Sequence, residues 1–349
     1  MVSFLISSAL ITWSSLQIIG SRGGQFLVAR SVSEISGAYT KLVNRELSQK
    51  ALEQRIQQEL SADDRNWTLL QSLREIADHQ DFELSQQTEE LWAAVSSEDH
   101  SLLNASKDCM QCMWNSEACV SSAAMICGLA LNFTPIGDVA GLTRASVALA
   151  TGEDVDEIDV ALSAVGIGAT AMVFSPAVVA GVPTKIGAGL LKFANLSGNI
   201  PLPILRTLRT AAKEGVDWAK LRTSKSAADV SRSLRPQART PIRESAESVA
   251  TINSNTGANQ ALYLLRSADS VADLKQLARA TDALGSKTSG YIALFGKSKI
   301  LRLTLRLADE VYYLLAGISG FFISTFTGLF QFVLGRALRR IDRGERRRG

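Results

Sequence analysis

The sequence predicts an all-α protein anchored in a membrane, with a central helical hairpin rich in small residues and a C-terminal transmembrane helix. Three observations predict this fold class. Residues 311–335 contain no charged side chain, an arginine-rich tail follows them directly, and apolar residues elsewhere recur mostly every three to five positions, as in amphipathic helices. The chain has 349 residues, of which 46% are hydrophobic and 20% charged, so it can bury a sizeable core.

Residues 1–20 form a moderately apolar segment whose first following basic residue is Arg22. We expect either a signal peptide or an uncleaved signal anchor. The choice stays open, because no basic residue precedes the apolar run and no clear cleavage motif follows it. If the segment remains as an anchor with its N-terminus inside, the body of the protein lies outside the cytoplasm.

Residues 21–117 are predicted to form an acidic helical unit. One apolar stripe indicates a helix over residues 34–60, Ser61 is expected to cap a second helix, and a third passes through Trp92. Between residues 51 and 100 there are twelve acidic and three basic residues, a balance that we interpret as a solvated polar surface.

The chain contains four cysteines, clustered at Cys109, Cys112, Cys119 and Cys127. Three interpretations stay open: two disulfides, free buried thiols in helices, or a metal or iron–sulfur site. Export of the body favours the disulfides. Metal sites with four cysteines usually pair two CxxC motifs, whereas seven residues separate Cys119 from Cys127. The sequence does not predict which cysteines pair.

Residues 118–193 are predicted to form the hairpin, as two apolar legs joined by the acidic connection 152–159. Glycine, alanine and serine allow its helices to approach closely. We interpret the acids of the connection as capping groups, which the dipole of the following helix stabilises. Residues 160–184 form a second uncharged run of 25 residues, but Pro176 and Pro183 weaken it as a membrane span, and whether it crosses stays open.

The segment FTPIGDVAGLTRASVALATGEDVDEIDVALSAVGIGATA resembles the helical hairpin modules of bacterial polymorphic-toxin proteins. It is also similar to a group of proteobacterial membrane proteins, and the resemblance covers residues 119–193. The resemblance implies a bacterial, membrane-associated protein. Its motif is structural and carries no catalytic residue.

Residues 194–260 are predicted to be a basic linker rich in proline and serine, with one helix between Pro203 and Leu221. Between residues 185 and 243 there are twelve basic and three acidic residues, so this region could dock on the acidic N-terminal unit or on anionic lipid headgroups. Residues 261–310 are expected to be a helical juxtamembrane segment. Within it GYIALFGKS differs from a phosphate-binding loop, because five residues rather than four separate Gly290 from Gly296.

Residues 311–335 are predicted to be the transmembrane helix, since 25 residues at 1.5 Å each reach about 37 Å and a bilayer core is about 30 Å thick. Small residues every four positions predict a helix-packing face at Ala316, Gly320, Ser324 and Gly328. The tail 336–349 carries the arginines that set topology and contact lipid: Arg336, Arg339, Arg340, Arg343, Arg346, Arg347 and Arg348. This basic tail predicts a protein of the bacterial inner membrane whose body is periplasmic and whose C-terminus is cytoplasmic.

No nucleophile elbow, zinc-protease helix, dinucleotide fingerprint or true Walker loop occurs, so we predict no enzyme, no cofactor and no metal site. The formal net charge of +3 is concentrated in the tail, which argues against a nucleic-acid partner. No small-molecule substrate is identifiable. The expected partners are the lipid bilayer and either a second copy of the chain or another membrane helix, such as the Ser8 and Thr12 side of the N-terminal segment. We therefore expect a structural or interaction protein of the bacterial cell envelope. The alternative is a component of a toxin or secreted-effector system whose hairpin engages membranes.

Overall fold

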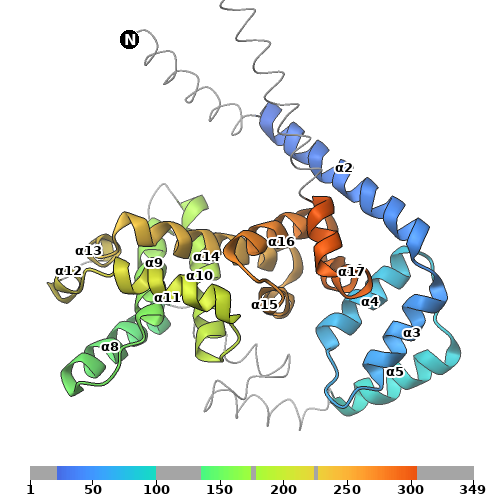
Figure 1. The fold of residues 1–349 in the computed structure, drawn as a ribbon, viewed down its shortest axis with the longest axis horizontal. Helices are drawn as coiled ribbons and strands as arrows, with labels where there is room; N and C mark the ends of the chain where they lie inside the picture. Colours follow the sequence, from blue (N-terminus) through green and yellow to red (C-terminus); the bar gives the residue numbers. More distant parts are fainter. Residues whose placement is uncertain (1–21, 100–134, 174–177, 224–226, 305–349) are drawn as a thin grey trace, which may run out of the picture. The chain divides into compact units, whose positions relative to one another are not determined.

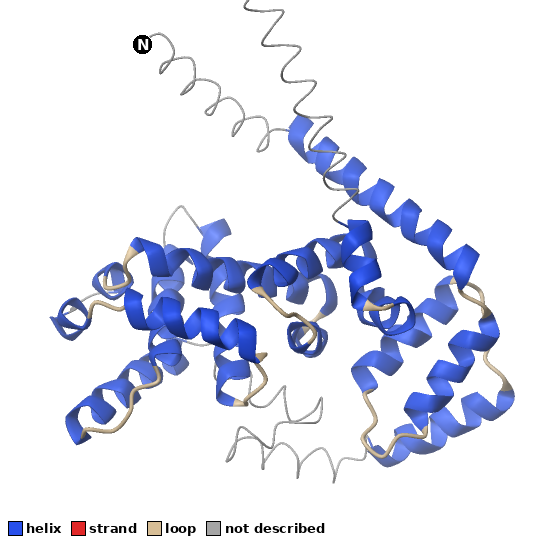
Figure 2. Ribbon diagram, in the orientation of Figure 1, coloured by secondary structure: helices blue, strands red, loops and turns tan. Residues whose placement is uncertain are grey.

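The computed structural model describes residues 22–99, 135–173, 178–223 and 227–304 (Figure 1). Within these ranges the chain forms helices and no strand, which confirms the predicted all-α class (Figure 2). None of the described helices is both long enough and apolar enough to cross a membrane. The predicted N-terminal anchor and the predicted span at 311–335 lie outside the described residues. The chain divides into two compact units, residues 1–35 with 303–349 and residues 36–302, and the core described below belongs to the second.

The N-terminal helices are α2 (Arg22–Glu46), α3 (Gln49–Leu60), α4 (Trp67–His79) and α5 (Gln86–Asp99). The helix expected over residues 34–60 is interrupted, because the Ser48 side chain accepts a hydrogen bond from the Ala51 N–H and caps α3. The expected capping role of Ser61 was wrong. Ser61 has helical backbone angles and ends α3, whereas Asn66 caps α4 by accepting from the Leu69 N–H at 3.0 Å.

Three helices occupy the region of the predicted hairpin: α8 (Pro135–Thr151), α9 (Glu157–Val173) and α10 (Val178–Leu196). The expected second leg is thus two helices rather than one. α9 contacts α8, α10, α11, α13 and α14, and its described side chains from Ile158 onward are buried or half-buried. A helix covered in this way needs small residues, and Ala161, Ala164 and Ala169 supply them.

The region predicted as a flexible linker is largely helical, so that interpretation is corrected. It contains α11 (Leu202–Gly215), α12 (Trp218–Thr223), α13 (Ala227–Arg232) and α14 (Pro236–Thr256). Pro236 occupies the first position of α14, where a missing N–H costs little. α14 carries a buried apolar stripe that packs into the core and consists of Ile242, Ala246, Val249 and Ile252. This stripe outweighs the prolines and serines on which the linker interpretation was based.

The C-terminal part of the core contains α15 (Ala258–Arg266), α16 (Val271–Leu284), the short 3-10 helix η2 (Gly285–Lys287) and α17 (Thr288–Phe295). The GYIALF residues belong to α17, so the described backbone there is helix rather than a phosphate-binding loop. α17 packs on α4. Tyr39 of α2, buried to 1% exposure, stacks on Tyr291 and donates a hydrogen bond to the Ile300 carbonyl at 2.8 Å.

Replacement of Gly187 by alanine should destabilise the protein, because a Cβ there would overlap the backbone carbonyl oxygen of Ala246 where α10 meets α14. We expect a loss of roughly 3 kcal/mol in the free energy of unfolding, measured by urea denaturation of the full chain. Gly37→Ala is the control, since a Cβ at that helical position meets nothing within 4 Å. Equal stability of the two variants would contradict the close approach of α10 and α14.

Candidate functional site

The site residues predicted from the sequence lie outside the described part of the chain. They are the four cysteines, the small-residue face and the basic tail: Cys109, Cys112, Cys119, Cys127, Ala316, Gly320, Ser324, Gly328, Arg336, Arg339, Arg340, Arg343, Arg346, Arg347 and Arg348. These predictions are therefore not tested by the structure. The described part of the chain brings together a set of five charged side chains and one serine that the sequence analysis did not identify. We call this set the charge cluster, and it consists of Asp138, Arg144, Asp159, Ser163, Lys185 and Lys192.

The first pair of the charge cluster joins α8 to α10. Lys185 Nζ donates a hydrogen bond to Asp138 Oδ2, and the two side chains are 10% and 2% exposed. Burial raises the pKa of the Asp138 carboxyl above its usual range, although the Lys185 ammonium opposes this shift. The carboxylate lies directly against Gly166 of α9, where a Cβ would come within 2.6 Å of Asp138 Oδ2. Glycine at 166 therefore makes room for this ion pair.

The second pair joins α9 to α10 and reaches α8. Lys192 Nζ lies 3.1 Å from Asp159 Oδ1, at an angle outside the range of a hydrogen bond, and it donates to Ser163 Oγ at 2.8 Å. Arg144 Nη2 of α8 donates to Asp159 Oδ2 at 2.8 Å. Lys192 is only 1% exposed, whereas Arg144 is 54% exposed. The ammonium of Lys192 is therefore sealed from solvent, and its charge is compensated within the protein.

The cluster follows from helical spacing on three helices. Lys185 and Lys192 are two turns apart on α10, and Asp159, Ser163 and Gly166 share one face of α9. The facing side of α8 carries Asp138, Gly141 and Ala145, all of which are buried. A Cβ at Gly141 would lie 2.6 Å from Lys192 Nζ. The signal in the sequence was the pair of lysines seven residues apart within an otherwise small and apolar helix.

The capping interpretation of the acidic connection is confirmed for Asp156, whereas Asp159 lies in the first turn of α9 as expected but has a second role. Asp156 Oδ1 accepts hydrogen bonds from the N–H groups of Ile158 and Asp159, at 3.0 and 3.1 Å, and so caps α9. The Asp159 carboxylate also points into the charge cluster. Asp159 and Lys192 are far apart in the sequence, so local sequence patterns did not predict this ion pair.

A cavity of about 430 Å³ lies beside the charge cluster, between α8 and the acidic connection. Asp159 forms part of its wall, together with Arg144, Glu153, Asp154 and Leu196. Among the described residues no three histidine, cysteine or carboxylate side chains are grouped so that they could hold a metal ion.

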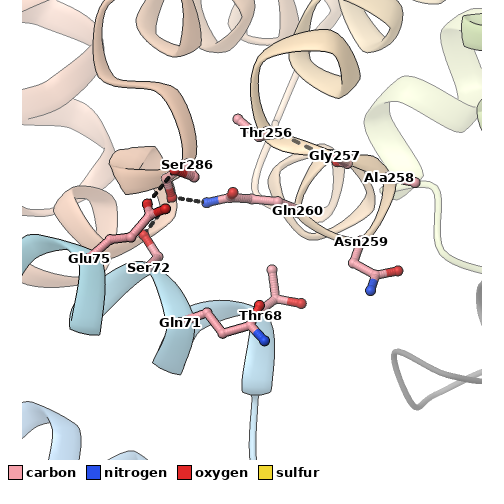
Figure 3. A pocket seen from close by; sticks show the side chains of 10 residues that line it. All are labelled: Thr68, Gln71, Ser72, Glu75, Thr256, Gly257, Ala258, Asn259, Gln260 and Ser286. Atoms are coloured by element: carbon pink, nitrogen blue, oxygen red, sulfur yellow. Dashed lines mark hydrogen bonds between the residues drawn. The ribbon is translucent and has the colours of Figure 1, made fainter.

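A second cavity, of about 380 Å³, lies between α4 and the α15 and η2 segments (Figure 3). Ser72 Oγ donates to the Ser286 carbonyl at 2.7 Å and accepts from the Gly290 N–H at 2.8 Å. Ser286 Oγ donates to the Glu75 carboxylate, and the Gln260 amide donates to the Ser286 carbonyl (Figure 3). Both serine hydroxyl groups are thus committed to protein acceptors, and no histidine lines the cavity to activate them. The network acts as a polar joint between segments more than 200 residues apart.

No family model matches the chain. No curated protein and no solved structure matches it either. The comparisons therefore leave the resemblance to toxin hairpin modules as a hypothesis from the sequence. The geometry of the described part supports a packing role for the charge cluster, because its contacts join α8, α9 and α10, and Asp138, Asp159 and Lys192 are each at most 5% exposed.

Removal of one partner from the buried pair should leave the other partner buried without compensation. In Lys185→Met the Asp138 carboxylate remains buried without its cation, and we expect a loss of about 3 kcal/mol in the free energy of unfolding at pH 7. The double variant Asp138→Asn/Lys185→Met should lose less than the sum of the two single variants, by about 1 kcal/mol or more. Urea denaturation of the full chain measures all four proteins, and additive losses would contradict the pairing.

The pH dependence of Lys185→Met provides a control for the same pair. Because burial raises the pKa of Asp138, the folded state takes up a proton at a higher pH than the unfolded chain does. The stability of Lys185→Met relative to the wild type should therefore rise as the pH falls from 7 through this raised pKa. The double variant, which has no ionisable group at position 138, should lack this rise.

Proposed function

We propose that this chain is a membrane-anchored structural or interaction protein of the bacterial cell envelope rather than an enzyme. The observation that carries the proposal is the uncharged run at 311–335 with the seven arginines that follow it. Its length fits a bilayer core, and the arginines favour a cytoplasmic C-terminus. The use of buried charge in the described body supports a structural role, since the charge cluster joins α8, α9 and α10 through side chains of which Asp138, Asp159 and Lys192 are buried.

The proposed location is the bacterial inner membrane, with the helical body in the periplasm. Residues 1–20 would then act as the export signal, either cleaved or kept as a second anchor. An oxidising periplasm would favour disulfides among the four cysteines, Cys109, Cys112, Cys119 and Cys127. The small-residue face from Ala316 to Gly328 would pack against a second copy of the chain or against another membrane helix.

Reporter fusions test this topology. Alkaline phosphatase, which is active in the periplasm, should be active when fused after Asp99 or Arg235. Green fluorescent protein, which folds in the cytoplasm, should fluoresce when fused after Gly349. The reciprocal fusions at the same positions serve as matched controls. Phosphatase that is inactive after both Asp99 and Arg235 would place the body in the cytoplasm and contradict the proposal.

The second candidate is a component of a toxin or secreted-effector system whose hairpin engages membranes. The exposed face of α8 favours it, since Val139 and Val147 lie eight residues apart on that face and are 57% and 54% exposed. Deletion of the hairpin is a poor test, because α9 and α10 contribute much of the core. Growth during overexpression should instead be compared between the full chain and Val139→Asp/Val147→Asp. A harmless full chain would count against this candidate.

A further inference from the structure

α11 carries a row of basic side chains on the face opposite the core. Arg206, Arg209 and Lys213 follow one another at spacings of three and four residues, so they lie on one side of the helix. All three are exposed, whereas Ile204, Leu208 and Ala212 on the opposite side are buried. We call the row, together with Leu202, the cationic strip, whose members are Leu202, Arg206, Arg209 and Lys213.

The three cations of the strip differ from three other basic residues in the same region. Lys220, Arg232 and Arg243 form ion pairs with Asp217, Asp229 and Glu247, each three or four residues away. Across the described residues, no carboxylate lies within ion-pair distance of the strip's three cations, which are Arg206, Arg209 and Lys213. Their charge is therefore available to an anionic partner.

Leu202 gives the strip an apolar end. Its side chain is 65% exposed, the highest value among the exposed large hydrophobic residues of the described chain. It lies one turn before Arg206, on the same side of α11. A helix that combines a basic face with an exposed apolar side chain fits the interface of a bilayer, where cations meet phosphates and the apolar group enters the acyl boundary.

We propose that the cationic strip is a docking surface for a bilayer that contains anionic phospholipid. Lipid phosphates accept hydrogen bonds from the Arg206 and Arg209 guanidinium groups and from the Lys213 ammonium, and Leu202 inserts beneath them. A lipid fits better than a nucleic acid, because no aromatic side chain that could stack on a base belongs to the strip. The inference goes beyond the proposed anchoring, since it assigns the folded body a membrane contact of its own.

Photo-crosslinking of the full chain tests the proposal. p-Benzoylphenylalanine replaces Leu202, and the protein is combined with vesicles of phosphatidylcholine alone or of phosphatidylcholine with phosphatidylglycerol. After irradiation, mass spectrometry measures the fraction of protein that carries a lipid adduct. We expect about tenfold more adduct with the anionic vesicles, and a decrease in that excess as the salt concentration rises.

Two charge-reversal variants distinguish an effect of the cationic strip from an effect of the protein's net charge. Arg206→Glu/Arg209→Glu/Lys213→Glu should reduce adduct formation to the level seen with phosphatidylcholine alone. Lys220→Glu/Arg232→Glu/Arg243→Glu changes the net charge equally but spares the strip, so it should retain most of the adduct. Circular dichroism checks that both variants keep their helical content. Equal adduct on both vesicle types, or equal loss in both variants, would overturn the proposal.

Competition by RNA and carbonate washing distinguish the lipid proposal from its alternatives. Suppression of the adduct by a short RNA duplex, without a preference for anionic vesicles, would identify a nucleic-acid surface and overturn the lipid assignment. Carbonate washing of the vesicles reports on the anchor independently of the strip. A chain that is extracted by carbonate but forms the anionic-lipid adduct would contradict the proposed anchoring alone. A retained chain without that adduct would contradict the strip alone.

Discussion

The enclosure of α9 is the constraint on which the rest of the described fold depends. Helices on several sides cover it, so it has no broad solvent-facing stripe of the kind that surface helices carry. Its residues are accordingly small or apolar, and its polar groups must find partners inside the protein. Ser163 and Asp159 meet this requirement through Lys192 of α10. Lys192 of α10 is therefore required by the polar residues Asp159 and Ser163 of α9.

The charge cluster is best understood as a determinant of helix position. Desolvation offsets much of the attraction within a buried ion pair, so such pairs add little net stability even though a broken pair is costly. A helix face of small residues, such as that of α8, can slide along a neighbouring helix. A helix whose carboxylate must meet one particular ammonium cannot slide without breaking that ion pair. We interpret the Asp138–Lys185 pair as fixing the position of α8, with Gly166 providing the space.

The sequence predicted the parts of the fold that local periodicity determines. The apolar stripe that includes Tyr39, Val43 and Ile56 predicted the N-terminal helices, and apolar spacing of three to five residues supported the all-α class. It did not predict α14, because Pro236, Pro241 and the serines obscured the buried stripe that begins at Ile242. It also missed the charge cluster. Asp138 and Lys185 are 47 residues apart, and a single sequence does not show which acid meets which lysine.

The described body thus combines a buried, charge-paired interior with a cationic strip whose charges are unpaired within the described residues. The most direct test of the central claim is hydrogen exchange of the backbone amides in the full-length protein. If the enclosure of α9 organises the fold, its amides should exchange among the slowest of the described helices, because they open only with the core. Faster exchange in α9 than in the peripheral α5 or α12 would contradict this account.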